Sequence, residues 1–110
     1  MLKLLIPVLA MSIVSLAATV SNAADEGWRD KALELAKEEP KVRDAIWSQN
    51  ISFWISVDDD GSSRDGYASY MCFVLRDAGK PEGEFVSVRV WDHVSMATNS
   101  PKQLGQASCQ

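Results

Sequence analysis

Three segments of the chain have a hydrophobic pattern strong enough to predict their secondary structure. Residues 51–57 and 84–92 alternate between apolar and polar or aromatic positions, which is the pattern of a half-buried strand. Between them, residues 65–78 carry apolar side chains at helical spacing, namely Ala68, Met71, Cys72 and Leu75. We therefore expect a strand, a helix and a second strand in succession.

The flanking segments favour helices. Residues 25–39 form an amphipathic stripe around Trp28 and Leu35, and Pro40 ends it. A second, shorter stripe follows over residues 42–49, from Val42, Ala45 and Ile46. Near the C-terminus, Ser100 and Pro101 resemble an N-cap and a first helical residue, which predicts a short helix over 101–107 with Leu104 turned inward.

Together these elements predict one small α/β domain over residues 24–110, in the order helix, strand, helix, strand, helix. Successive strands joined by a helix form a parallel pair. Because two strands make a very small sheet, an edge strand is expected from residues 92–98, from the N-terminal region or from another chain. If residues 65–78 are instead a strand, the fold becomes an N-terminal helix packed on a three-stranded antiparallel sheet.

Residues 1–23 have the composition of a secretory signal peptide. Lys3 precedes an uncharged, mostly apolar run over residues 4–20, and small residues at Ser21 and Ala23 suit a cleavage site after Ala23. The run is close to the lower length limit for crossing a membrane, so an uncleaved anchor is the alternative. We expect a secreted or periplasmic protein with no stable membrane anchor after cleavage.

The charge of the mature chain restricts the classes of partner. Cleavage removes Lys3 and no acid, so the formal charge of −4 becomes −5. A nucleic-acid-binding protein needs a basic surface to neutralise phosphates. The sequence therefore predicts no nucleic-acid partner and disfavours binding to anionic membrane surfaces.

The two cysteines predict a disulfide. Cys72 and Cys109 both remain in the mature chain, and export delivers them to an oxidising compartment. A bond between them closes a long loop and stabilises the fold by about 4 kcal/mol in the chain-entropy model. Two free thiols or an intermolecular bridge are the alternatives. With one histidine and no ligand spacing, the sequence predicts no metal site and no cofactor.

Neither the acidic loop nor the single histidine forms a recognisable catalytic motif. Asp58, Asp59 and Asp60 precede Gly61, but this loop lacks the acidic first and twelfth positions of an EF-hand. His93 has no nucleophile elbow to accompany it. We therefore assign no catalytic residue and leave open whether the chain is an enzyme, with the balance against it.

The tryptophans are the most informative candidates for binding. Trp54 and Trp91 stand on the more polar side of their strands, with Arg89 nearby, and share one side of the sheet if the strands are neighbours. Tryptophan with arginine is typical of contact surfaces. The alternative is that a helix covers this side and the rings are core. The candidate binding residues are Trp54, Trp91, Arg89, Asp58, Asp59 and Asp60.

The sequence thus favours a small exported, non-catalytic binding or interaction protein. We expect its partner to be an unidentified protein or a second copy of the chain. Two specific versions of this function are association with the cell envelope and inhibition of a secreted hydrolase by an exposed loop. Two alternatives belong to other classes. One is a small secreted hydrolase that uses Asp and Glu carboxylates, and the other is a calcium-stabilised structural module.

Overall fold

A computed structural model describes the backbone of residues 20–110 and the side chains of residues 27–110. The order of elements is α1 (Val20–Glu38), β1 (Asp44–Gln49), β2 (Ser52–Val57), α2 (Asp65–Ala78), β3 (Val86–Asp92), the 3-10 helix η1 (Val94–Ala97) and β4 (Gln103–Cys109). This confirms a small domain of mixed helices and strands. The three strongest sequence predictions correspond to β2, α2 and β3.

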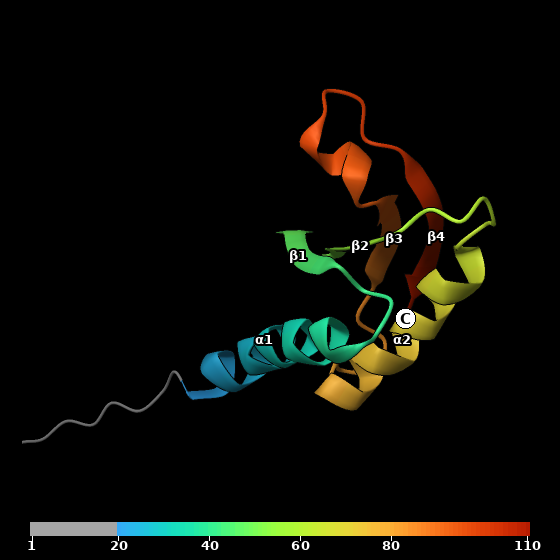
Figure 1. The fold of residues 1–110 in the computed structure, drawn as a ribbon. Coiled ribbons are helices and arrows are strands. Elements are labelled where there is room, and N and C mark those ends of the chain that lie inside the picture. The colour runs from blue at the N-terminus through green and yellow to red at the C-terminus, as the bar shows by residue number, and fades with distance from the viewer. Residues whose placement is uncertain (1–19) are drawn as a thin grey trace, which may run out of the picture.

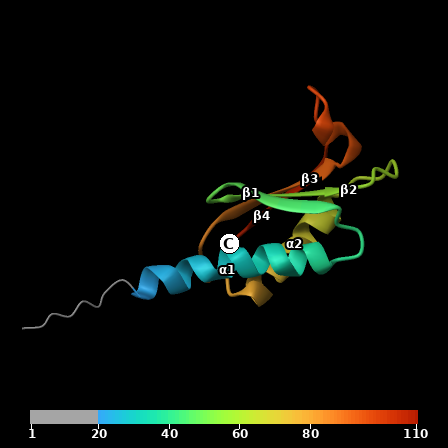
Figure 2. The same ribbon diagram turned by 60° about the vertical axis from the view of Figure 1, so that its left-hand side comes forward.

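The four strands form one mixed sheet in the order β1-β2-β3-β4. The central strands β2 and β3 run parallel and are joined by α2, as predicted, whereas both outer pairs are antiparallel. Both helices lie on one side of the sheet, and η1 rises on the other side (Figures 1 and 2). Among the described residues, α1 and α2 cover one face of the sheet, and the other face has only η1 over one of its ends.

The prediction of a helix over residues 42–49 is wrong. This segment forms β1, which pairs antiparallel with β2 across a tight turn. Ala45 is buried and its neighbour Ile46 is 44% exposed, so consecutive residues point to opposite sides as in a strand. The helical stripe required both to face the core. Ladder hydrogen bonds to β2 outweigh the weak local preference for helix.

The prediction of a helix over residues 101–107 is also wrong. The segment forms β4, which pairs antiparallel with β3. Leu104 does pack against the core, and the C-terminus does reach the body of the domain, but it does so in an extended conformation. A helix this short has little stability of its own, whereas the strand gains a complete ladder along β3. Two strands of the chain's own thus complete the sheet.

The core lies between the sheet and the two helices. From the sheet it takes the buried side chains of β2 and β3, namely Phe53, Ile55, Val57, Val86, Val88 and Val90. From the helices it takes Trp28, Ala32 and Ala36 of α1 and Ala68, Met71, Val74 and Leu75 of α2. Each fully buried aliphatic or aromatic side chain stabilises the fold by about 1.5–3 kcal/mol relative to exposure.

The predicted disulfide is present. Cys72 of α2 is bonded to Cys109 at the end of β4, and the described residues contain no free cysteine. A second close contact joins β4 to the start of α2, whereas the disulfide is at the middle of that helix. The Gly105 backbone passes so close to Arg64 that an added Cβ would lie 2.2 Å from the Arg64 carbonyl carbon. The edge strand is therefore fixed to the helix at both ends.

The predicted signal peptide falls largely on residues that the structure does not describe. Within the described residues, α1 runs over Val20–Glu38 and overlaps both the predicted helix over 25–39 and the end of the predicted signal peptide. Within the described residues, no helix is long and apolar enough to span a bilayer. A disulfide in a domain with these properties is compatible with an extracellular location.

Candidate functional site

The sheet face opposite α1 and α2 carries the candidate binding residues Trp54, Trp91 and Arg89, and we call it the open face. Strand register places its side chains in three rows across the sheet. The first row is Ser52, Ser87 and Ser108; the second is Ile46, Trp54, Arg89 and Gln106; the third is Asp44, Ser56, Trp91 and Gln103. Apart from the ends Asp44 and Ile46, the rows contain aromatic and polar side chains and one cation.

Trp54 and Trp91 form a pair on this face, as the alternation predicted. Their ring centroids lie 4.7 Å apart with an interplanar angle of 49°. Both rings are partly buried, and neither helix covers them. The other two tryptophans lie on the helix side, where Trp28 and Trp47 pack edge to face at 5.5 Å. The four tryptophans thus divide into one pair on each side of the sheet.

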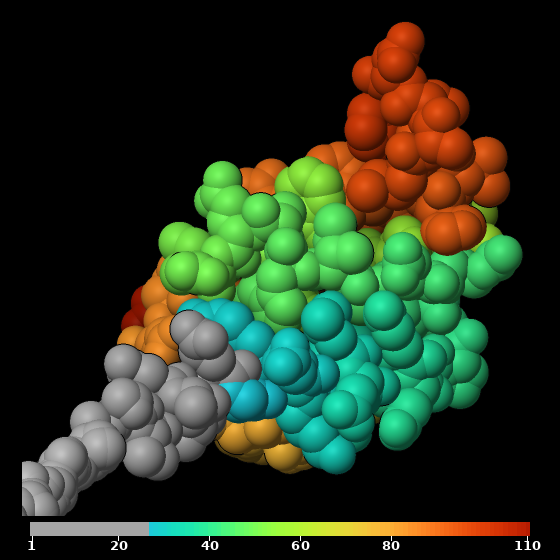
Figure 3. Space-filling view, turned by 90° about the vertical axis from the view of Figure 1, so that its left-hand side faces the viewer, coloured from blue at the N-terminus to red at the C-terminus, as the bar shows by residue number. Residues whose placement is uncertain are grey.

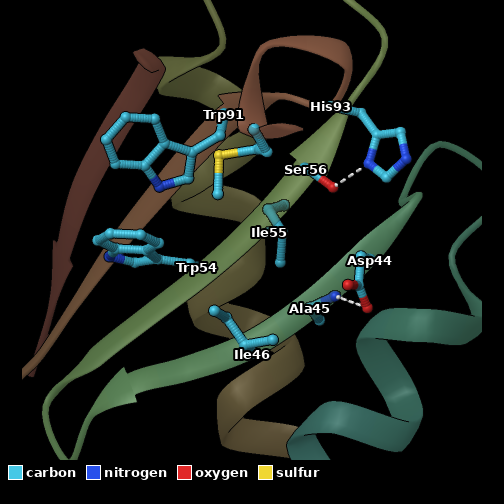
Figure 4. A pocket seen from close by; sticks show the side chains of 9 residues that line it. Asp44, Ala45, Ile46, Trp54, Ile55, Ser56, Trp91 and His93 are labelled. Carbon is cyan, nitrogen blue, oxygen red and sulfur yellow. Dashed lines mark hydrogen bonds between the residues drawn. The ribbon is translucent and has the colours of Figure 1, made fainter. Parts of the chain in front are cut away.

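One hydrogen bond and the contact between the two rings orient the outer pair. The Trp54 indole N–H donates to Ser52 Oγ at 3.0 Å. The Trp91 Nε1 atom is buried without a hydrogen-bond acceptor, and Figure 4 shows it on the edge of the ring that faces Trp54. Both rings are therefore held in place by each other and by Ser52.

A chain of planar polar groups runs beside the tryptophans. Arg89 is the register partner of Trp54, and its Nη1 donates to Gln103 Oε1 at 2.9 Å. Gln103 Nε2 in turn donates to Gln106 Oε1 at 3.2 Å. Among residues 27–110, Arg89 forms no ion pair with a carboxylate. Its guanidinium retains donors that point to solvent, because only one of its five N–H groups is used.

A small hollow of about 70 Å³ lies beside the tryptophan pair. Figure 4 shows Trp54 and Trp91 on one side of it and Ile46 and His93 across from them. Met96 also lines the hollow. Met96 belongs to η1, so the segment after β3 folds back over this end of the open face. The hollow is mostly apolar and too small for a drug-sized ligand, whose pockets start at about 300 Å³.

His93 contacts Ser56 at a distance that a base and a nucleophile also use. The His93 Nδ1 atom lies 2.8 Å from Ser56 Oγ, and Ser56 is only 5% exposed. In the described part of the chain, no carboxylate hydrogen-bonds the second ring nitrogen of His93, so the orienting acid of a triad is missing. The His93 backbone N–H also donates to Val57 O at 2.8 Å. These contacts fix the end of β3 to β2.

The three aspartates of the 58–60 loop are each paired within the chain. Asp58 accepts from Arg43 at 2.8 Å, Asp59 from Lys102 at 2.9 Å, and Asp60 lies 3.4 Å from Arg64. The three cations come from three different segments. Within residues 27–110, no group of three acidic, histidine or cysteine side chains suits a metal ion. The loop thus joins neighbouring segments at this end of the sheet.

These contacts change the acidity of the groups involved. The hydrogen bond from Lys102, followed by that from the Gly61 N–H, lowers the pKa of Asp59 below its ordinary value. The Ser62 hydroxyl, which donates to Asp60, lowers the pKa of Asp60 in the same direction. Lys102 shows the reciprocal effect, since its hydrogen bond to Asp59 raises its pKa. All three groups are therefore charged at neutral pH.

The sequence indicated only part of the open face. Trp54, Trp91 and Arg89 follow from the alternation in the two central strands, but Ile46, Gln103 and Gln106 lie in segments predicted as helices. The alternation of small side chains in Gly105, Ala107 and Cys109 with polar ones in Gln106 and Ser108 was the available signal for β4. It is weak because small residues carry little hydrophobic contrast.

None of four prominent hollows on the described part of the chain combines two carboxylates. The hollow beside Trp54 has Asp44, and a larger one of about 540 Å³ beside the disulfide has Glu82. The remaining two have Glu39 and Asp30. Glycoside hydrolysis needs a pair of carboxyl groups about 5–10 Å apart across the scissile bond. These hollows lack that arrangement.

Comparisons of the chain with protein-family models, with curated proteins and with solved structures find no match.

Proposed function

We propose that this chain is an exported, non-catalytic binding protein and that the open face, centred on Trp54, Trp91 and Arg89, is its ligand-binding surface. The observation that carries the proposal is the tryptophan pair on the uncovered side of the sheet. Large aromatic side chains contribute most when they are buried. A pair that stays at the surface is explained by contact with a ligand.

The folding core supports this assignment because it is complete without the pair. Phe53, Ile55 and the valines of β3 are fully buried on the helix side, where Trp28 and Trp47 also lie. The Trp54 and Trp91 rings contribute to the other side only. Their loss therefore weakens ligand binding more than it weakens folding.

Two observations favour binding over catalysis. The Ser56–His93 contact lacks an orienting acid among the described residues, and the hollows there lack paired carboxylates. The rings and the Arg89–Gln103 contact, in contrast, form a rigid surface before any ligand arrives. Preorganisation of this kind reduces the ordering cost of binding.

Export is part of the proposal and is supported by the leader-like composition of residues 1–23 and by the disulfide. We place the mature protein in the periplasm or outside the cell. Mass spectrometry of the protein from exporting cells tests this directly, with a mature chain starting at Ala24 as the expected result. An intact N-terminal Met1 would contradict export by this signal.

Photo-crosslinking in exporting cells tests the binding surface. A benzophenone side chain is introduced at Gln106, which is exposed on the open face, and separately at Lys31, which is exposed on α1. We expect adducts from position 106 and not from position 31. The position-106 adducts should disappear when Trp54 and Trp91 are both replaced by alanine, because the rings supply most of the contact.

The outcome also separates the ligand classes. After protease digestion, a foreign peptide crosslinked to the peptide that carries position 106 identifies a protein partner, and a peptide of this chain identifies a second copy. A mass on that peptide that glycosidases remove identifies a glycan. Equal adducts from positions 106 and 31, or adducts that persist without the tryptophans, would contradict the proposed surface.

A further inference from the structure

We infer that the ligand of the open face is a neutral saccharide chain, stacked on Trp54 and Trp91 and hydrogen-bonded by Arg89, Gln103 and Gln106. This inference rests on the proposed function, because it names the class of ligand for the same surface. Three features of the face support it: its shape, the kind of polar groups it presents, and its charge.

The shape suits a flat ligand with one apolar side. The hollow beside the tryptophan pair is small, at about 70 Å³, so it does not accept a large side chain of a protein partner. The hot spots of protein interfaces are well-packed, fully desolvated pockets near the centre. A pyranose ring instead presents axial C–H groups over one face, and these groups pack against an indole ring without a pocket.

The polar groups suit hydroxyls. Arg89 is the register partner of Trp54, and its guanidinium donates to Gln103, which in turn donates to Gln106 on the neighbouring strand of the same face. Each amide has two donors and an acceptor with two lone pairs, so most of their capacity remains for a ligand. A sugar ring carries both donors and acceptors around its rim. It therefore matches this mixed set better than a purely apolar or purely anionic ligand does.

The charge disfavours a polyanion. The full chain has a formal charge of −4, and Asp44 stands at the β1 edge of the same face. Arg89 is the only cation in the three rows of the open face. One guanidinium held by a neutral amide does not compensate the repulsion of an acidic protein for a highly charged chain. The ligand is thus uncharged for most of its length.

The rings are ready to stack before the ligand binds. Ser52 Oγ accepts a hydrogen bond from the Trp54 indole N–H at 3.0 Å, and the Trp91 ring packs against the Trp54 ring with centroids 4.7 Å apart. Loose surface tryptophans would lose rotamer freedom on binding, whereas these have already lost it on folding. The fixed rings therefore reduce the conformational entropy that is lost on binding, which matters most for a ligand that makes few contacts with each ring.

Nuclear magnetic resonance of the indole N–H groups tests the inference, with the folded, disulfide-bonded protein and five defined hexasaccharides. The four neutral probes are cellohexaose, maltohexaose, laminarihexaose and N-acetylchitohexaose, and the anionic probe is a hyaluronan hexasaccharide. With at least one neutral probe at millimolar concentration, we expect the Trp54 and Trp91 signals to shift. The Trp28 and Trp47 signals lie on the helix side and serve as internal controls that stay in place.

Substitutions complete the test. Trp54→Ala and Trp91→Ala should each weaken the binding of that neutral probe by about tenfold or more. Phe73→Ala removes an aromatic ring that is 53% exposed on α2, on the other side of the molecule, and should leave the affinity unchanged.

Three results would overturn the inference: no shift of either outer indole with any neutral probe, binding of the hyaluronan probe alone, or an equal loss of affinity with Phe73→Ala. Its failure is distinguishable from failure of the proposed function. If position 106 gives adducts with a protein and no saccharide binds, the saccharide is ruled out as the ligand, but the open face remains the binding surface.

Discussion

Lys102 and Asp59 join two loops at the end of the sheet where β2 and β3 finish. Lys102 precedes β4, and Asp59 follows β2, so their 2.9 Å contact joins segments 43 residues apart in sequence. The same end of the molecule carries the segment around residues 93–102, which stands out from the body in Figure 3. The contact therefore holds this projection against the acidic loop.

Replacing Lys102 by methionine should raise the pKa of Asp59 towards its ordinary value, because the hydrogen bond that lowers it is the largest of its causes. Titration of the Asp59 carboxyl by nuclear magnetic resonance measures this directly. Lys31→Met is the control, since among residues 27–110 the Lys31 side chain pairs only with Glu34 on α1. No movement of the Asp59 pKa in the Lys102 variant would show that the contact is not formed in solution.

The sign of the pH dependence follows from the direction of that change. A carboxyl whose pKa is lower in the folded chain than in the unfolded chain stabilises the fold above the unfolded pKa of about 4. That contribution is lost as the pH falls through the folded pKa. Loss of stability in acid should therefore be smaller for the Lys102→Met variant than for the unaltered protein.

At the scale of elements, β4 depends on a close approach to the start of α2. Arg64 N donates to Leu104 O at 2.9 Å, and Gln106 N donates to Asp65 Oδ1 at 2.9 Å. Gly105 lies between these two contacts and is buried. The backbones approach so closely there that only a residue without a side chain fits.

Gly105→Ala should destabilise the protein by about 2–3 kcal/mol, the upper range for overpacking, because backbone atoms rather than a flexible side chain block the added methyl group. Urea unfolding gives the free energy. Gly66→Ala is the matched control: it lies in the first turn of α2 with open space around it, and alanine favours helix by up to about 1 kcal/mol. Equal effects of the two substitutions would contradict the close approach.

The same scale explains which elements the sequence predicts. The patterns are strong in the central elements because one face of each is buried in the core and the other is more polar. These elements are the strands predicted over residues 51–57 and 84–92 and the helix predicted over 65–78. The edge strands lack that contrast: one side of β1 carries Ile46 beside Trp54, and β4 is built mostly of small and polar residues. Their conformation is imposed by pairing with β2 and β3, which local pattern does not reveal.

The candidate site was predictable to the same extent. Once β2 and β3 are neighbours, strand parity places Trp54 and Trp91 on one side of the sheet, and Arg89 with them. The contributions of Gln103, Gln106 and Met96 depend on the edge strand and on η1, which the pattern does not predict. The internal pairing of all three aspartates of the 58–60 loop depends on contacts between distant segments and likewise has no local signature.

At the scale of the whole molecule, the disulfide joins the final strand to the helix that connects the central strands. Cys109 is 3% exposed and Cys72 partly buried, and the two lie 37 residues apart in sequence. The chain is small enough that its hydrophobic core supplies only a modest margin of stability. The bond therefore accounts for a large fraction of that margin.

Replacing both cysteines by alanine should lower the free energy of unfolding by about 4 kcal/mol, the loop-entropy contribution for this separation. Urea unfolding of the double variant, and of the unaltered protein with and without reductant, measures it. The unaltered protein, denatured without reductant, should contain no titratable thiol. Two thiols per chain, or an unchanged unfolding midpoint in reductant, would contradict the bond.

The central claim is that folding does not need Trp54 and Trp91, and that they remain at the surface for a ligand. Urea unfolding of the Trp54→Ala, Trp91→Ala double variant, compared with Phe53→Ala, tests it most directly. Loss of a partly exposed aromatic pair should cost about 2 kcal/mol for both substitutions together, against about 4 kcal/mol for the single fully buried ring of Phe53. A double variant that loses as much stability as Phe53→Ala, or more, would make the pair part of the core and contradict the account.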